Sequence, residues 1–278
     1  MALDWTEFDK DDHSTLCAYV VCRHGRATPL LWKTGKKNAI KDQQKAYENP
    51  LVEPLHALVP PAVLIPLLAN RGFGDQKLYA LLEALGWDVI IRFRGGISVE
   101  AEGQCRPASA WVPASGCTRM LSGARVTADK AAVPAVVVVH DRKRKEPWWL
   151  ATTLTSRTAS EIVKGYGRRF RIEETFRDPK DLHFGMDLSA THIRSADRRD
   201  RLLFVVALAL SLLTLLRAAS EAAGFGNHFG KKGKRSASTR SFVKAGIGTK
   251  RCRIAQTSGA RRCSNTSTRC CASNPLRS

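Results

Sequence analysis

The sequence predicts an α/β protein built on a mixed β-sheet flanked by helices, and two observations support this fold class. The chain has 278 residues, 44% of them apolar, which is enough to bury the core of one ordinary domain plus an appendage. Its first apolar segments follow one another as hairpin, helix, strand, helix and strand, an order typical of a mixed sheet with helical connections. We expect one domain over residues 1–223 and a tail over 224–278.

The first elements follow from apolar runs and the residues between them. Residues 15–22 and 26–33 are apolar runs that predict a hairpin with Gly25 in its turn. The polar stretch 37–49 fits a helix. Residues 62–69 are a short apolar run that predicts a buried central strand, although Pro66 disfavours a strand there.

The next segments alternate between helix and strand. From Gln76 onward, apolar residues recur on one helical face, and Gly86 is suited to end that helix. Residues 87–94 predict another strand. Residues 95–150 are rich in Gly, Ser, Ala and Pro and predict a β-rich insertion, with strands at 132–140 and 147–154.

Two helices are expected after the insertion. A capping-box pattern at 158–161 predicts a helix that begins near Thr158 or Ser160 and continues to about Arg177. A second, very apolar helix is expected over about 197–223. Its longest apolar run, 202–216, is short for a membrane span and predicts a buried helix, so we expect no membrane contact.

The charge of the chain points to a polyanion as partner. The formal net charge is +20, and residues 231–278 contain 13 Lys or Arg and no Asp or Glu. Clustered cations release condensed counterions when they neutralise phosphates, so nucleic acid is the first candidate. The composition of the tail predicts disorder and binding without choice of sequence.

The cysteines and the N-terminus predict a cytoplasmic protein. The eight Cys residues form no CxxC pair and have no His at zinc-ligand spacing, so we interpret them as reduced thiols. The first residues lack the basic and apolar regions of a signal peptide.

The segment 165–181 combines aromatic, basic and acidic residues. At 100° per residue, Tyr166, Arg169 and Glu173 share one helical face, whereas Pro179 is expected to end the helix and place Lys180 on the following loop. This spacing alone also fits a solvated helix held by ion pairs.

The paired Trp148 and Trp149 are interpreted as packing residues, with stacking on a base as the alternative.

The spacing of Tyr166, Arg169, Glu173 and Lys180 matches the Tyr-Arg-Glu-Lys signature of the insertion-sequence-4 family of bacterial DDE transposases. The surrounding segments "RIEETFRDPKDLHFGM", "LGWDVIIRFRGG", "RGFGDQKLY" and "LDWTEFD" are also similar to that family, over about residues 3–223. The chain resembles an N-terminally truncated copy, and its tail resembles an out-of-frame product.

This resemblance implies a ribonuclease H-like fold and metal-dependent DNA cleavage and strand transfer at the ends of an insertion sequence. In such a site, acidic residues hold two Mg²⁺ or Mn²⁺ ions that activate the nucleophile and stabilise the leaving oxygen. The implied catalytic and metal-binding positions are Asp4, at the end of the first strand, Asn70 and Glu173. Tyr166, Arg169 and Lys180 would contact DNA phosphates. The implied partner is double-stranded DNA, both terminal repeats and target, bound by a homodimer.

The second acidic position departs from the family pattern, because Asn70 stands where the family has Asp. An amide lacks the negative charge that holds a hard cation. Asp75 is the nearest acid, and we interpret it as a helix N-cap rather than a replacement. Three functions remain open: a transposase of doubtful activity, a catalytically inactive DNA-binding remnant and, with less support, a nuclease or repair factor on the same fold.

Overall fold

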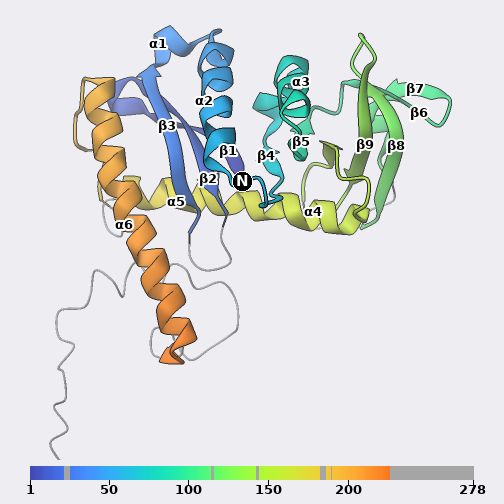
Figure 1. Ribbon diagram of the computed structural model, residues 1–278. Helices are drawn as coiled ribbons and strands as arrows, with labels where there is room; N and C mark the ends of the chain where they lie inside the picture. The colour runs from blue at the N-terminus through green and yellow to red at the C-terminus, as the bar shows by residue number, and fades with distance from the viewer. Residues whose placement is uncertain (22–25, 114–115, 142–143, 182–185, 189, 226–278) are drawn as a thin grey trace, which may run out of the picture.

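The computed structural model describes residues 1–21, 26–113, 116–141, 144–181, 186–188 and 190–225. Its centre is one ten-stranded sheet in the order β3-β2-β1-β4-β5-β10-β9-β8-β6-β7. Helices lie on both faces of this sheet (Figure 1). The predicted mixed α/β sheet flanked by helices is therefore confirmed.

The first five strands make up the mixed half of the sheet. Strands β1 (Ala2–Phe8), β2 (His13–Val20) and β3 (Thr28–Lys36) are antiparallel neighbours, so the expected hairpin forms, with its turn at Gly25 outside the described residues. Strands β4 (Leu67–Ala69) and β5 (Val89–Phe93) run parallel to β1. The expectation that the first strand ends at Asp4 is wrong, because β1 pairs with β2 over its whole length.

The second half of the sheet is antiparallel. It consists of β10 (Trp148–Thr152), β9 (Ala131–Val139), β8 (Thr118–Val126), β6 (Ser98–Ala101) and β7 (Gln104–Pro107). The strands predicted at 132–140 and 147–154 are confirmed as β9 and β10. Trp148 is 3% exposed and the indole of Trp149 donates to the Ala108 carbonyl at 2.8 Å, which favours packing over base stacking.

One face of the sheet is covered by α2 (Gln44–Leu58) and α3 (Gln76–Ala84), whose apolar residues share a core with β1, β4 and β5. The helix expected at 37–49 is wrong in its bounds. A short α1 (Lys37–Ile40) comes first and Asp42, with φ of +64°, lies between the two helices. The helix α2 then continues through Pro50 and Pro54, because Leu51, Val52 and Leu55 on its inner face are buried.

The other face is covered by α4 (Ala159–Gly167) and α5 (Arg171–Lys180), joined by a 3-10 turn at Arg168–Phe170 (Figure 1). The capping box predicted at the start of α4 is confirmed, with Thr158 as the N-cap. Pro179 does not end α5 before Lys180, so that expectation is wrong. Buried contacts of the neighbouring Asp178 hold the helix through the proline.

The long apolar helix predicted over 197–223 is present as α6 (Ala196–Ala222). The expectation that it is buried is wrong for most of its length, since only Arg199, Val206, Ala207 and Leu210 are buried. Its first half packs against β3 and its second half extends beyond the sheet (Figure 1). Within the described part of the chain, α6 is the one helix whose length and composition would suit a membrane span.

Candidate active site

The register of two parallel strands places Asp4 beside Asn70. Leu3 on β1 is paired with Ala69 on β4, so the two residues that follow them are adjacent. Ala2 and Leu68, two residues earlier on each strand, belong to the core beneath α4 and α5. Because side chains alternate along a strand, Asp4 and Asn70 point to this same face. Residues 66 positions apart therefore meet under the helices that carry Arg169 and Glu173.

Four hydrogen bonds fix the orientation of these side chains. The Asn70 Oδ1 accepts from the Gly72 backbone N–H at 2.7 Å, and this leaves the Asn70 Nδ2 to donate to Asp4 Oδ1, also at 2.7 Å. The Trp5 backbone N–H donates to the same Asp4 oxygen at 3.1 Å. Arg169 donates to Asp4 Oδ2 at 2.8 Å. Both carboxylate oxygens of Asp4 are thus engaged by donors of the chain itself.

Glu173 lies at the edge of this cluster. It stands one helical turn after Arg169, on α5, and its side chain is exposed. It is close enough to raise the pKa of Asp4, and it helps to raise the pKa of Arg169. The structure therefore brings Asp4, Asn70 and Arg169 into contact, with the exposed carboxylate of Glu173 nearby.

The electrostatics of Asp4 follow from its burial. Asp4 is 6% exposed, and loss of hydration raises its pKa above the ordinary value of 3.8. Arg169 and the Trp5 N–H oppose this shift, while Glu173 adds to it. For Arg169 burial opposes the charge, but Asp4, Tyr166 and Glu173 outweigh it, so that the pKa of the guanidinium is raised. In this arrangement the positive charge that faces Asp4 is supplied by an arginine.

The two other predicted DNA contacts, Tyr166 and Lys180, make bonds within the domain. The Tyr166 side chain is 1% exposed, its ring is T-shaped against Trp148 at 5.0 Å, and its hydroxyl shares a hydrogen bond with Arg169. Lys180 donates to Thr6 Oγ1 at 2.7 Å and to the Glu7 carbonyl, and burial lowers its pKa. Tyr166 orients Arg169, and Lys180 attaches the end of α5 to β1. Their contacts with DNA stay predictions.

The donor set at this position does not fit a pair of hard divalent cations. Mg²⁺ takes oxygen ligands, favouring carboxylates, but Asn70 turns its NH₂ group rather than its oxygen toward Asp4. Asp4 has no oxygen without a donor. Among the described residues, no group of three or more His, Cys, Asp or Glu side chains is placed to hold a metal ion.

Asp75 does not lie where it could replace an acid at the position of Asn70. It occupies the N-cap position of α3, as expected, but its side chain makes no capping hydrogen bond and instead pairs with Lys45 at 2.9 Å. It also lies near Glu48, which binds the Trp5 indole. Trp5 points to the opposite face of β1 from Asp4, so Asp75 is separated from the candidate site by the sheet.

Sequence reasoning missed a second ionic cluster on the same helices. The Arg26 side chain is 4% exposed and pairs with both Asp178 and Glu174 of α5. The Ala27 backbone N–H donates to Thr175 at 3.0 Å beside it. Similarly, Arg199 of α6 is fully buried and pairs with Asp11. No sequence motif predicts these ion pairs, because each of them joins residues more than 140 positions apart.

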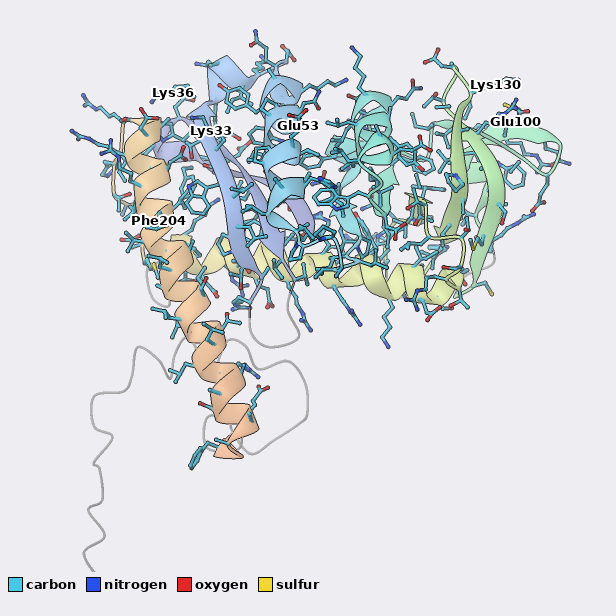
Figure 2. All side chains as sticks on the ribbon, in the orientation of Figure 1. Lys33, Lys36, Glu53, Glu100, Lys130 and Phe204 are labelled. Atoms are coloured by element: carbon cyan, nitrogen blue, oxygen red, sulfur yellow. The ribbon has the colours of Figure 1, made fainter. Side chains whose placement is uncertain are left out.

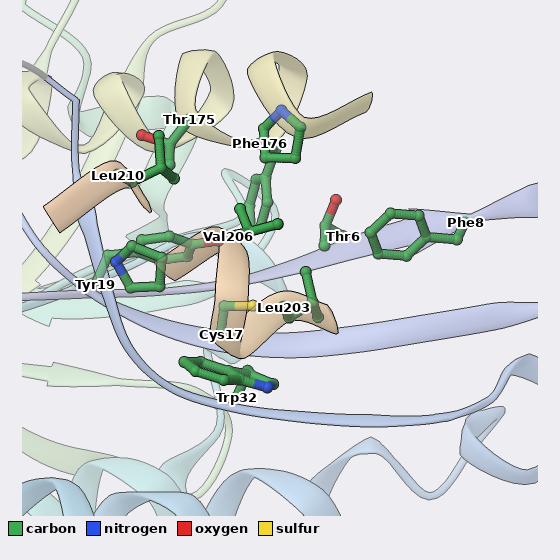
Figure 3. A pocket seen from close by; sticks show the side chains of 12 residues that line it. Thr6, Phe8, Cys17, Tyr19, Trp32, Thr175, Phe176, Leu203, Val206 and Leu210 are labelled. Atoms are coloured by element: carbon green, nitrogen blue, oxygen red, sulfur yellow. The ribbon is translucent and has the colours of Figure 1, made fainter. Parts of the chain in front are cut away.

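An apolar hollow between the sheet and helices α5 and α6 is a separate feature (Figure 3). Its lining includes Phe8, Cys17, Tyr19 and Phe176. Burial raises the pKa of the Cys17 thiol to about 12, so this cysteine is not a nucleophile near neutral pH. The lining of this hollow is mostly apolar, so it has few groups that could bind or react with a polar ligand.

Comparison with known protein families shows to which class of protein this chain belongs. The model of the transposase DDE domain family matches residues 37–212, more than half of the chain. The chain therefore belongs to the transposase DDE domain family. The match contains Asn70 and the 166–180 segment, and it begins after Asp4. No curated protein matches the chain.

Proposed function

We propose that this chain is a transposase-family protein that binds DNA and supports little or no metal-dependent cleavage at Asp4, Asn70 and Glu173. The observation that carries the proposal is the hydrogen bond from the Asn70 amide to Asp4. DDE transposases generally use divalent metal ions, and the family implies DNA binding. In this chain a neutral amide and a guanidinium take the positions around Asp4 that a cation would need.

The fold supports the rest of the assignment. The strand order β3-β2-β1-β4-β5, with β1, β4 and β5 parallel, supports a ribonuclease H-like domain over residues 1–223, with 95–150 as its β-rich insertion. The spacing of Tyr166, Arg169, Glu173 and Lys180 supports membership of the insertion-sequence-4 group. We assign the protein to the cytoplasm, where it would act on element ends and target DNA.

Basic side chains around the site support DNA binding. Lys164, Arg168 and Arg177 are exposed on the helical unit that carries Arg169 and Glu173. Lysine and arginine at such positions attract phosphates and give binding that weakens with salt. We propose that DNA lies along this side of α4 and α5, next to Glu173.

The chemical weakness of the site comes from Asn70. Its amide cannot add negative charge, and its oxygen is already used by the Gly72 N–H. Among the three predicted metal-binding residues, Glu173 alone is exposed. One outward acid and one buried acid paired with Arg169 are a poor set for two cations, since the protein ligands of each ion in such sites are mainly carboxylates.

A cleavage assay tests this function directly. Purified protein and the Asn70→Asp variant would be incubated with Mg²⁺ or Mn²⁺ and plasmid DNA that carries the sequences flanking the gene. We expect DNA binding by both proteins, with weak or no cleavage by the unmodified chain and a gain in the variant. Glu173→Gln in the Asn70→Asp background should abolish that gain. Robust metal-dependent cleavage by the unmodified chain would refute the proposal, and absence of DNA binding would remove the transposase role.

A further inference from the structure

An arginine lies beside Asn70 on the neighbouring strand. Strands β4 and β5 are paired up to Ala69, so the residues that follow this pair, Asn70 and Arg92, are adjacent. Arg92 is also paired with Leu150 on β10, which belongs to the core beneath α4 and α5. Paired residues point to the same face of a sheet, so Arg92 lies on the face of Asp4 and Asn70. The strands β1, β4 and β5 therefore present an acid, an amide and an arginine in one row.

The side chain of Glu146 connects this arginine to a second one. Glu146 precedes β10, and its Oε2 lies 3.1 Å from Arg92 Nη2 and 3.7 Å from Arg71 Nη1. Arg71 directly follows Asn70 in the chain. One carboxylate oxygen is thus shared by two guanidinium groups at the edge of the candidate site. Within the described part of the chain, Glu146 is the acid with which both arginines pair.

Arg92 has a donor that Glu146 does not use. Its Nε is buried and has no hydrogen-bond partner among the described residues, and the same holds for the Nε of Arg169. Burial raises the pKa of Tyr166, Arg169 opposes this shift, and Arg92 is close enough to oppose it as well. A guanidinium has five N–H donors and binds phosphate oxygens in pairs. This corner of the site therefore has spare donors for an oxyanion.

Glu146 is held less firmly than the buried acids of the domain. Its side chain is 64% exposed and that of Arg71 is 58% exposed, whereas Arg92 is 17% exposed. Asp178, by contrast, is mostly buried and binds Arg26 with both carboxylate oxygens. Exposed ion pairs are weak and are screened by salt. A phosphate can therefore compete with Glu146, and rotation of one exposed side chain is enough to make room for it.

We propose that Glu146 competes with a DNA phosphate for Arg71 and Arg92 and thereby weakens the binding of DNA at this site. This inference rests on the proposed DNA binding and adds a regulation of the same site by a carboxylate of the chain itself. In the DNA-free protein the carboxylate offsets the positive charges, and DNA must displace it before a phosphate reaches them. The basic tail supplies 13 further cations, so we expect a change in affinity rather than its gain or loss.

The test measures the affinity of the purified full chain for DNA. A short fluorescent duplex that carries sequence from beside the gene would be titrated, with fluorescence anisotropy as the readout, at about 0.1 M NaCl and at higher salt. We expect Glu146→Gln to tighten binding by about threefold to fivefold, the range of an exposed ion pair. The control is Glu53→Gln on α2, across the sheet from α4 and α5, where Figure 2 labels this exposed acid. It removes the same charge and should change the affinity far less.

A double-mutant cycle connects the effect to the two arginines. In a chain that carries Arg71→Gln and Arg92→Gln, the further change Glu146→Gln should no longer tighten binding. Arg92→Gln alone should weaken binding and reduce the slope of log affinity against log salt by about 1. Thermal unfolding would verify that each variant folds, and Arg71→Gln, at an exposed position, completes the cycle if Arg92→Gln does not.

Each possible outcome decides the proposal. Tighter binding that depends on the two arginines supports it. If the unmodified chain binds DNA and Glu146→Gln changes the affinity no more than Glu53→Gln does, or changes stability alone, Glu146 is a structural residue and this inference fails while the proposed function stands. Equal tightening without the two arginines also overturns it. Absence of DNA binding by every variant removes the proposed function and this inference together.

Discussion

Two buried aspartate–arginine pairs attach the helices α4 and α5 to the sheet, and they differ in their surroundings. Asp178 meets Arg26 with both carboxylate oxygens, and Glu174 completes a closed ionic cluster. Asp4 meets Arg169 with one oxygen, while the other accepts from Asn70 and the Trp5 N–H. Only the second pair lies where two parallel strands run side by side and an exposed acid stands nearby.

This difference teaches how a structural ion pair is distinguished from a candidate site. The Arg26 cluster consists of two acids and one base whose role is complete once α5 is docked. The Asp4 cluster contains an amide at the position where we expect the second acid of the family, and this amide donates a hydrogen bond that an ionised carboxylate could not donate. Mutation of the first cluster should change stability alone, whereas replacing the amide of the second cluster by an acid should also create a response to divalent cations.

The largest effect is expected from breaking the closed cluster. Asp178→Ala leaves the Arg26 charge buried without its main partner and should lower the free energy of unfolding by about 3–5 kcal/mol. Denaturation by urea would measure the loss. The exposed acid Glu53 provides the control, since Glu53→Ala should change stability little. An equally small loss for Asp178→Ala would show that this cluster does not hold α5.

A smaller effect with a distinct signature is expected from Asn70→Asp. In the presence of EDTA, a second carboxylate against Asp4 replaces a hydrogen bond with repulsion, and the variant should lose about 1–3 kcal/mol. Millimolar Mg²⁺ or Mn²⁺ should restore part of this stability, because a ligand that binds only the folded state stabilises it. Melting temperature with and without metal would measure both changes.

The control for this experiment is Asn38→Asp, the same substitution at an exposed position of α1. It and the unmodified chain should show no specific response to divalent cations. If the unmodified chain gains as much stability from Mg²⁺ as Asn70→Asp does, the amide does not stand in the way of the metal.

A loss of about 1 kcal/mol is expected from Thr158→Ala, which removes the N-cap of α4 far from both clusters. Thr158→Ser keeps the hydroxyl and should retain most of the stability. This pair of variants also tests whether the cap of α4 influences the candidate site. We expect that loss of the cap leaves the cation response of Asn70→Asp unchanged. A changed response would mean that the cap also positions Arg169.

The smallest effect concerns pH. Burial raises the pKa of Asp4 in the folded protein above 3.8, so protonation of Asp4 is easier in the folded than in the unfolded state. The stabilisation that comes from protonated Asp4 is therefore fully present below pH 3.8, and it is lost as the pH rises through the pKa of Asp4 in the folded protein. Relative to Asp4→Asn, the unmodified chain should become less stable across that window. A difference in stability that does not vary with pH would contradict the raised pKa.

Much of the fold was predictable because its signals are local. The hairpin, the strands β5, β9 and β10, the helix α3 and the capping box at Thr158 each depend on a short pattern of apolar residues, turn formers or cap residues. The amide at Asn70, where we expect an acid, could also be noticed in the sequence, because it lies directly before the segment "RGFGD". Pro179 misled the local reasoning about the end of α5, since buried contacts outweighed its cost.

The sequence by itself determined the α/β class, the family resemblance and the fact that one expected acid is an amide. The tertiary structure alone decided that the Asn70 amide faces Asp4, that Tyr166 is buried and Lys180 bonds to β1, and that apolar side chains of α6 stay exposed among the described residues. The physical reason is that hydrogen-bond direction and burial depend on which distant segments meet. Strand register and helix packing determine which segments are in contact, and neither can be predicted from the spacing of residues in one motif.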